Sequence, residues 1–109
     1  MADALPEHRM DGKVAIVTGA GSRADGIGNG RAAAILMARA GAKVLLIDTM
    51  PDWAEATAKM IHAEGGTCQV HKADVTDAAQ CQAAVKAAVD AWGRVDALVN
   101  NVGVGGPTG

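Results

Sequence analysis

The chain has 109 residues, which suits a single domain, and half of them are hydrophobic, which is enough for a packed core. Its net charge is −2 and no run of Lys or Arg stands out, so neither a nucleic acid nor an acidic membrane surface is expected as a partner. No apolar run reaches the length of a membrane span, and the polar start lacks the apolar core of a secretory signal. We therefore expect a cytoplasmic protein whose two cysteines, Cys68 and Cys81, are reduced thiols.

Apolar runs and helical periodicity alternate along the first half of the chain. Residues 14–17 form a short continuous apolar run, which predicts a strand buried on both faces. Residues 28–40 carry apolar side chains at helical spacing, and Gly41 is well placed as the C-terminal cap of that helix. A second apolar run at residues 44–47 predicts the next strand.

The second half repeats this alternation, with clearer helix boundaries. Asp52 and Glu55 are spaced as a capping box, as are Asp77 and Gln80, and Gly93 is placed to end the second of these helices. The expected elements are a helix over residues 52–64, a strand over 67–72, a helix over 77–92 and a strand over 95–99.

The order βαβαβαβ predicts the α/β class, with a parallel sheet, right-handed crossovers and helices on both faces. We expect one domain over residues 12–103, preceded by a polar extension at residues 1–11 and followed by a glycine-rich tail at 104–109. A sheet of this kind binds ligands at the carboxyl ends of its strands. The loops that follow Val17, Ile47, Lys72 and Val99 are therefore the candidates for function.

The first of these loops, residues 18–28 (TGAGSRADGIG), is rich in glycine. Glycines let the backbone turn tightly and let a pyrophosphate approach the positive N-terminal end of a helix. The loop has two possible registers. The first matches G-x-G-x-x-G/A at residues 19–24, but it puts Gly26, Gly28 and Gly30 inside the helix, at about 1 kcal/mol each relative to Ala. The second register turns at Gly26 and Gly28 and is favoured.

Asp48 ends the second strand, 20 residues after Gly28 and 24 after Ala24, and an acid about 20 residues beyond the glycines usually binds the ribose. A carboxylate there can accept hydrogen bonds from both ribose hydroxyls and would repel a 2′-phosphate, so the sequence favours NAD over NADP. Arg23 weighs the other way, because its guanidinium could reach a phosphate. The alternative for Asp48 is an acid that only caps a loop.

Two further strand ends carry polar groups. Asp74 follows the third strand, where its carboxylate could accept from an adenine amino group while Val75 packs on the ring. The alternative for Asp74 is a helix cap, a role that Asp77 fills better. The cluster at residues 100–103 (NNVG) follows the fourth strand and could line a cofactor cleft, or form a polar turn.

Taken together and in order, these motifs resemble the N-terminal, cofactor-binding half of a short-chain dehydrogenase/reductase, over residues 12–103. The resemblance implies a Rossmann-type fold, an NAD(P) cofactor, and hydride transfer between the nicotinamide and an alcohol or carbonyl substrate. It implies homo-oligomers in the family. The residues that it assigns to the cofactor are Gly19, Ser22, Arg23, Gly26, Ile27 and Gly28 at the pyrophosphate, Asp48 at the ribose, Asp74 and Val75 at the adenine, and Asn101, Val102 and Gly103 at the middle of the cofactor.

The sequence departs from the family pattern in its loop and its catalytic groups. Residues 23–25 look like a three-residue insertion, and Val102 replaces the usual Ala. Family members use a Ser, a Tyr and a Lys for catalysis. This chain has no Tyr, and its only Ser is Ser22. We therefore expect the catalytic segment to be absent, no residue here to be catalytic, and the sheet to have a bare apolar edge beyond the fourth strand.

Two other classes share part of this pattern. A methyltransferase that uses S-adenosylmethionine has a similar glycine loop and acid, but residues 100–103 suit a nicotinamide cleft better. A non-catalytic nucleotide-binding module would fit the missing Tyr. A metal site is not expected, because His8, His62 and His71 are scattered and make no ligand set.

Overall fold

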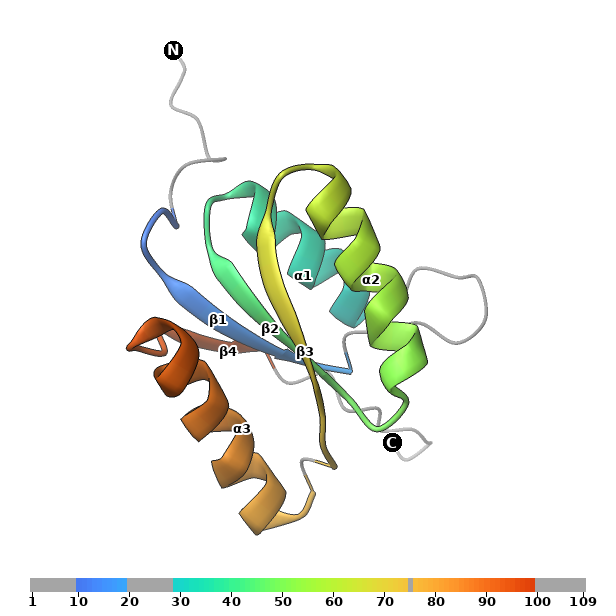
Figure 1. The fold of residues 1–109 in the computed structure, drawn as a ribbon, viewed down its shortest axis with the longest axis vertical. Helices are drawn as coiled ribbons and strands as arrows, with labels where there is room; N and C mark the ends of the chain where they lie inside the picture. Colours follow the sequence, from blue (N-terminus) through green and yellow to red (C-terminus); the bar gives the residue numbers. More distant parts are fainter. Residues whose placement is uncertain (1–9, 20–28, 75, 100–109) are drawn as a thin grey trace.

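A computed structural model describes residues 10–19, 29–74 and 76–99 of the chain, and the elements alternate there as the sequence predicts (Figure 1). Each boundary of the elements through β3 lies within one residue of its prediction. The elements are β1 (Val14–Thr18), α1 (Asn29–Arg39), β2 (Lys43–Asp48), α2 (Pro51–Ala63), β3 (Thr67–Lys72), α3 (Ala78–Trp92) and β4 (Ala97–Val99).

The strands form one parallel sheet in the order β3-β2-β1-β4, with α1 and α2 on one face and α3 on the other (Figure 1). Alternate residues of a strand point to opposite faces. Val44 and Leu46 therefore pack with α1 and α2, whereas Leu45 and Ile47 pack with α3. All four are almost fully buried, because helices cover both faces of β2. The predicted α/β fold with helices on both faces is confirmed.

The ends of α3 follow the local signals in the sequence. The carboxylate of Asp77 accepts from the backbone N–H of Ala79 at 2.9 Å and of Gln80 at 3.3 Å, and Gly93 ends the helix in the left-handed conformation, with φ of 85°. The amide oxygen of Gln80 accepts from the N–H of Asp74 at 2.8 Å, so this side chain joins the helix to the end of β3.

The capping box predicted at Asp52 and Glu55 is wrong. The N-cap of α2 is Met50, which makes no side-chain capping bond, and the helix begins at Pro51. Proline suits this first position, because its fixed φ is already helical and its missing N–H would have no partner there. Asp52 instead lies within the first turn, where its charge favours the positive end of the helix dipole.

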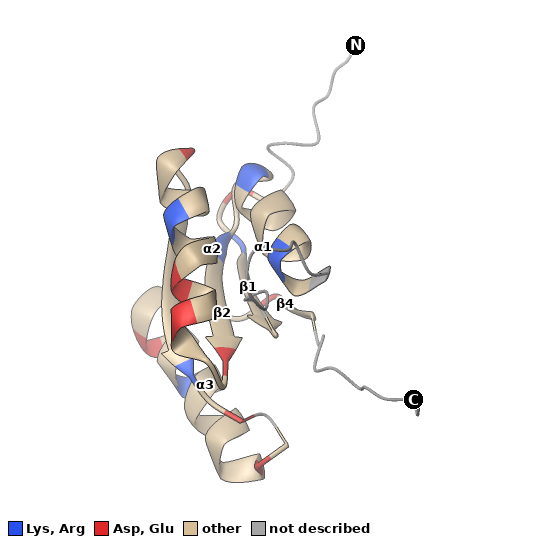
Figure 2. Ribbon diagram, turned by 90° about the vertical axis from the view of Figure 1, so that its right-hand side faces the viewer, with Lys and Arg blue, Asp and Glu red and all other residues tan. Residues whose placement is uncertain are grey.

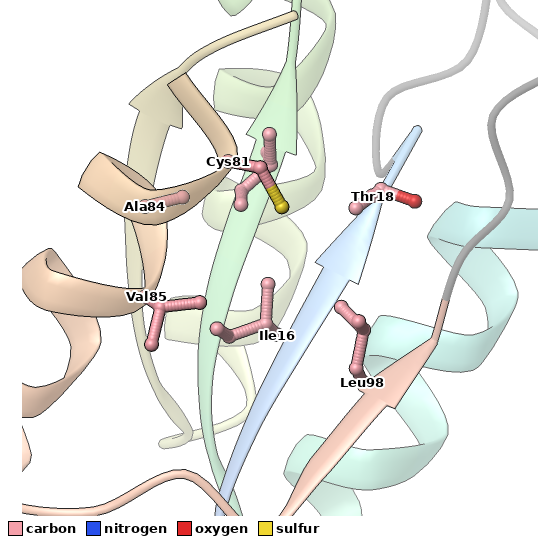
Figure 3. Close-up of a pocket in the computed structure, with 7 residues that line it drawn as sticks. Ile16, Thr18, Cys81, Ala84, Val85 and Leu98 are labelled. Carbon is pink, nitrogen blue, oxygen red and sulfur yellow. The ribbon is translucent and has the colours of Figure 1, made fainter. Parts of the chain in front are cut away.

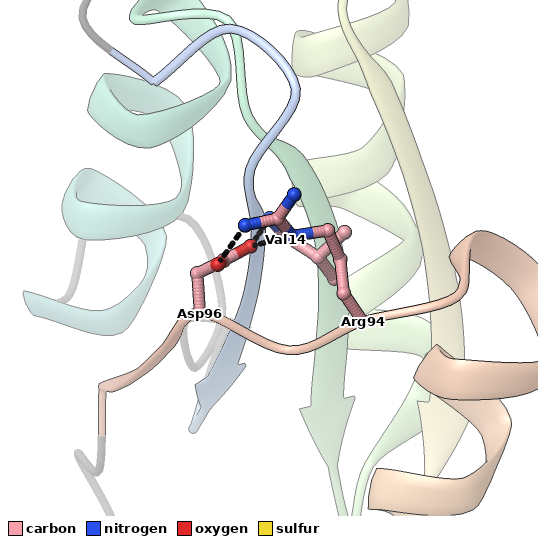
Figure 4. A network of polar contacts seen from close by, with 3 residues as sticks. All are labelled: Val14, Arg94 and Asp96. Atoms are coloured by element: carbon pink, nitrogen blue, oxygen red, sulfur yellow. Dashed lines mark hydrogen bonds and ion pairs between the residues drawn. The ribbon is translucent and has the colours of Figure 1, made fainter.

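Strand β4 begins at Ala97, two residues later than predicted. Just before it, the side chain of Asp96, and not a backbone carbonyl, accepts the hydrogen bond from the N–H of Val14. The carboxylate of Asp96 accepts from the N–H of Val14 at 2.8 Å, and the N–H of Asp96 donates to the carbonyl of Val14 at 2.8 Å (Figure 4). Arg94 donates to the same carboxylate from Nε at 2.8 Å and from Nη2 at 2.7 Å. This network fixes the register of β4 against β1 at their amino ends.

Apolar side chains are exposed beside β4, which is the last strand of the described sheet on that side. Leu98 of β4 is 57% exposed, and Val85 and Val89 of α3 are also exposed. Among the described strands, β4 is thus an edge strand with one largely exposed apolar side chain. Acidic and basic residues both lie along α2 (Figure 2). Among the described residues, no helix is both long and apolar enough to span a bilayer.

The Asp96 network predicts an acid-sensitive contribution to stability. The hydrogen bond from Arg94, and then that from the N–H of Val14, hold the pKa of Asp96 below its ordinary value. A lowered folded-state pKa stabilises the fold above the unfolded value of about 4, and the contribution is lost as pH falls through the folded-state pKa. We expect Asp96→Asn to lower the melting temperature at pH 7, and this difference to shrink as the pH falls below about 4.

Thermal unfolding followed by circular dichroism between pH 2 and 7 measures this effect. Asp90→Asn is the matched control, because Asp90 makes an exposed ion pair with Lys86 of the same helix. An Asp96→Asn variant that melts with the unmodified protein at pH 7 would contradict the prediction.

Gly41 at the α1–β2 turn gives a second stability prediction. Its φ is +103°, and a Cβ there would overlap Oδ1 of Asp11. We expect Gly41→Ala to destabilise the fold by more than about 1 kcal/mol in urea unfolding. Gly65 also has positive φ but nothing within 4 Å of a Cβ, so Gly65→Ala isolates the backbone strain. Equal losses in the two variants would show that the contact with Asp11 adds nothing.

Candidate functional site

The parallel register gathers the candidate residues at one edge of the sheet. Thr18 pairs with Ile47, and Asp48 pairs with Lys72, so the carboxyl ends of β1, β2 and β3 lie side by side. Gly19, Asp48 and Asp74 come at or directly beyond these ends. The structure thus brings together the predicted site residues that it describes, at the edge where such sheets bind ligands.

The first turn of α1 rests directly on the end of β1, at a contact between two glycines. Gly19 leaves the strand with φ of +60°, a left-handed conformation that glycine adopts readily. A Cβ on Gly30 would overlap the carbonyl oxygen of Gly19 and lie 2.7 Å from its carbonyl carbon. Backbone cannot yield as a flexible side chain can, so only glycine fits at position 30. The contact places the N-terminal end of α1 against Gly19, the first residue after β1.

Sequence reasoning counted Gly30 only as a cost to the helix and missed this contact. In dinucleotide-binding folds the third glycine of the fingerprint permits close packing of helix on strand, and here Gly30 has that position. Residues 28–30 (GNG) repeat the glycine spacing of residues 26–28, which was the available signal. The remaining predicted site residues lie outside the described part of the chain: Ser22, Arg23, Gly26, Ile27, Gly28, Val75, Asn101, Val102 and Gly103.

Asp48 lies at the end of β2 and is 9% exposed. Its Oδ1 accepts a hydrogen bond from the backbone N–H of Met50 at 3.0 Å, so the carboxylate does cap the turn that leads into α2. A carboxylate offers about four acceptor positions on its two oxygens, so capping a turn and accepting from a ligand are compatible roles. The group is buried, oriented by the backbone, and placed one strand away from the Gly19 turn.

Asp74 lies two residues beyond β3 and is exposed. Its Oδ1 accepts from the hydroxyl of Thr76 and from the N–H of Thr76 at 2.9 Å. These bonds, the hydroxyl first, lower the pKa of Asp74, so it is an ionised acceptor at neutral pH. The cap of α3 is Asp77, as expected, and Asp74 is left as an acceptor at the edge of the sheet.

The sheet order reverses between β1 and β4, and Thr18 bridges that point. Its hydroxyl donates to the carbonyl oxygen of Val99 at 3.3 Å, which ties the carboxyl ends of the two strands together. A switch point of this kind is where open α/β sheets place their ligand crevice. Thr18 is buried and was not among the predicted site residues.

An apolar cavity of about 70 Å³ lies beside the switch point, between α3 and the sheet (Figure 3). It offers an apolar surface next to the polar groups at the strand ends. The side chains around it are those of Ile16, Thr18, Ile47, Cys81, Ala84, Val85 and Leu98.

The described residues hold no cluster of His, Cys, Asp and Glu that could bind a metal ion. The Sγ of Cys68 lies 3.4 Å from Nε2 of His62. Burial, and then the charge of Glu55, raises the pKa of Cys68 to about 11, so it is a neutral thiol at pH 7 and a poor nucleophile.

Known proteins resemble this chain along almost its whole length. The family profile described as "short chain dehydrogenase" matches residues 13–109. D-threitol dehydrogenase of Mycolicibacterium smegmatis is 42% identical over 98 residues, which cover 90% of this chain and 36% of the relative. 7alpha-Hydroxysteroid dehydrogenase of Escherichia coli K12 is 40% identical over 99 residues, covering 91% of this chain and 37% of the relative.

Solved structures agree with these matches. A short-chain dehydrogenase/reductase from Burkholderia xenovorans superposes with a TM-score of 0.85 at 45% identity, covering 93% of this chain and 41% of that one. A hydroxysteroid dehydrogenase from Escherichia coli gives a TM-score of 0.83 at 39% identity, covering 94% and 41%. The chain therefore spans roughly two fifths of the length of the proteins that it matches. These matches do not favour the methyltransferase or the non-catalytic module, and they show that the chain belongs to the short-chain dehydrogenase/reductase family of oxidoreductases.

Proposed function

We propose that this chain is the NAD-binding part of an oxidoreductase that transfers hydride between a nicotinamide cofactor and an alcohol or carbonyl substrate. The observation that carries the proposal is the placement of buried Asp48 at the strand end next to the Gly19–Gly30 contact. A helix N-terminus favours a pyrophosphate, and a carboxylate one strand away suits ribose hydroxyls. Together they match the two polar parts of an adenosine diphosphate group.

The rest of the proposed site follows from the strand ends. Gly19, Gly26, Ile27 and Gly28, with Ser22 and Arg23, would hold the pyrophosphate, and Asp74 and Val75 the adenine. Asn101, Val102 and Gly103 would reach the middle of the cofactor. The apolar cavity beside α3 supports this arrangement, because an adenine ring needs an apolar surface next to its hydrogen-bonding edge.

The charge of Asp48 favours NAD over NADP. A 2′-phosphate at the ribose would bring a second negative charge against a largely buried carboxylate, where water screens repulsion poorly. Arg23 favours NADP instead, because its guanidinium would attract a phosphate. It lies outside the described residues.

The chain's own contribution to the reaction is to bind and orient. When bound, the nicotinamide supplies the hydride chemistry. With no Tyr in the sequence and Ser22 in the phosphate loop, none of the 109 residues is assigned as the general acid or base. We propose that those groups belong to a part of the whole protein outside this sequence. The matched relatives are named for threitol and a 7alpha-hydroxysteroid, and the dehydrogenase chemistry that they share is the basis for an alcohol or carbonyl substrate.

Calorimetric titration of the chain with NADH and NADPH tests the role of Asp48. We expect Asp48→Asn to weaken NADH binding by about ten- to a hundredfold, because hydrogen bonds to a charged group contribute about 1.5–3 kcal/mol. Asp52→Asn is the matched control, since Asp52 is an exposed acid in the adjacent helix turn. The Asp48→Asn substitution should also narrow the preference for NADH over NADPH.

Three outcomes would contradict this proposal. Tighter binding of NADPH than NADH by the unmodified chain would overturn the cofactor preference. Equal losses from Asp48→Asn and Asp52→Asn would remove Asp48 from the site. Binding of S-adenosylmethionine in place of either nucleotide would restore the methyltransferase alternative.

Gly30→Ala tests the helix–strand contact. The added methyl must push α1 away from β1, at about 1–3 kcal/mol of stability, and we expect NADH binding to fall with it. Gly66→Ala is the control, because its Cβ would also be crowded, at 2.7 Å from Cγ2 of Ile61, but at the opposite end of the sheet. Melting temperature and NADH affinity are measured for both variants. A Gly30→Ala protein that binds NADH normally would show that the contact does not shape the site.

A further inference from the structure

Arg31 is a charged side chain buried near the proposed site, and nothing in the sequence analysis gave it a role. It follows Gly30 in the first turn of α1 and is 2% exposed. Its Nε donates to Oγ1 of Thr57 at 2.8 Å, and its Nη2 donates to the carbonyl oxygen of Trp53 at 3.3 Å. Thr57 and Trp53 both belong to α2, so the guanidinium joins the beginning of α1 to the first half of α2.

We infer that Arg31 is a positioning residue, which fixes the N-terminal end of α1 relative to the turn that carries Asp48 and so couples binding of the pyrophosphate and ribose ends of the cofactor. The inference rests on the proposed function, because that proposal assigns the two ends to these two places. It adds a residue that acts through its contacts with α2.

A continuous set of contacts connects Arg31 to Asp48. The carbonyl group that Arg31 binds belongs to Trp53, in the first turn of α2, and the N–H of Trp53 donates to the carbonyl of Met50 at 3.0 Å. The N–H of Met50 in turn donates to Oδ1 of Asp48 at 3.0 Å. A shift of Arg31 therefore moves the first turn of α2 relative to α1, and Met50 and Asp48 move with that turn as one unit.

Arg31 is also connected to the proposed pyrophosphate end through the backbone. It is the residue after Gly30, which lies against the carbonyl of Gly19. Arg31 thus fixes the distance between the two ends of the proposed site. Burying a guanidinium is costly, and an apolar side chain of the same size would fill the space more cheaply. Its directional donors give something that an apolar residue cannot, which is a fixed distance and angle between two helices.

The same two helices are joined a second time, far from the site, by a different arginine. Arg39 in the last turn of α1 donates to Glu64 at the end of α2, from Nε at 2.8 Å and from Nη2 at 2.7 Å. This pair is exposed, with side-chain exposures of 55% and 42%. Arg39 therefore provides a matched control, an arginine on the same helix that binds the same neighbouring helix at its opposite end.

The experiment compares a ligand that spans both ends with one that reaches a single end. NADH spans them, whereas adenosine carries the ribose and lacks the pyrophosphate. In the 109-residue chain we expect Arg31→Met to weaken NADH binding by about tenfold or more and to change adenosine binding by less than about twofold. Arg39→Met should change neither. Titrations are followed by calorimetry for NADH and by NMR for adenosine.

Two further variants keep the test clear of simple unfolding. Thr57→Val removes one acceptor from Arg31 and preserves the shape of the buried side chain, so it should give a smaller loss of the same kind. Arg31→Lys keeps the charge without the two-directional donors, and it should not restore NADH binding. Without ligand, hydrogen exchange of the Trp53 amide should quicken in Arg31→Met, while protection of the Met50 amide and of α3 stays unchanged.

Each result has a distinct meaning. Parallel losses of NADH and adenosine binding, or a uniform fall in amide protection, would show that Arg31 only stabilises the fold, and would overturn the inference. Equal effects of Arg31→Met and Arg39→Met would overturn it as well, while leaving the proposed function intact. If the unmodified chain bound neither NADH nor adenosine, the proposed function itself would fail, and the inference with it.

Discussion

The contact of Gly30 with the carbonyl of Gly19 is the constraint on which the site depends. It allows the first turn of α1 to lie on the end of β1 with no side chain between them. Because the helix starts there, its first N–H groups and positive dipole end lie at the carboxyl end of β1. The next residue, Arg31, is then carried into the space between α1 and α2, where it holds the start of α2. One missing Cβ thus sets the position of two helices.

The sheet supplies the second requirement, which is that groups distant in sequence meet at one edge. Parallel pairing of β1 with β2 and β3 brings Gly19, Asp48 and Asp74 to successive strand ends. Burial on both faces makes this register firm, because a slip by one residue would exchange the sides of every apolar residue in β2. At the amino ends, Asp96 fixes β4 against β1 through the N–H of Val14. Thr18 joins the same two strands at their carboxyl ends.

Local signals predicted most of the fold, and contacts across the fold account for what they missed. The ends of α3 were predicted closely, because Asp77 and Gly93 act on their own neighbouring backbone. The N-terminal cap of α2 was not, since Met50 precedes Pro51 and makes no side-chain capping bond. At the site, Asp48 and Asp74 could be found from strand-end position alone. The roles of Gly30 and Arg31 could not be found in this way, because each depends on a contact with another element. Gly30 lies against the carbonyl of Gly19, and Arg31 donates to Thr57 of α2.

The two interpretations of Asp48, a turn cap and a ribose acceptor, support each other. An acid that has to be desolvated and oriented by its ligand spends part of the binding free energy on that step. Here folding has already buried the carboxylate, and the N–H of Met50 has already set its orientation. A ligand donor that reaches Asp48 would meet a group that needs little rearrangement. The backbone turn after β2 is therefore part of the proposed binding site, even though it would contribute no side chain to the ligand, and any substitution that loosens this turn acts on Asp48 without touching it.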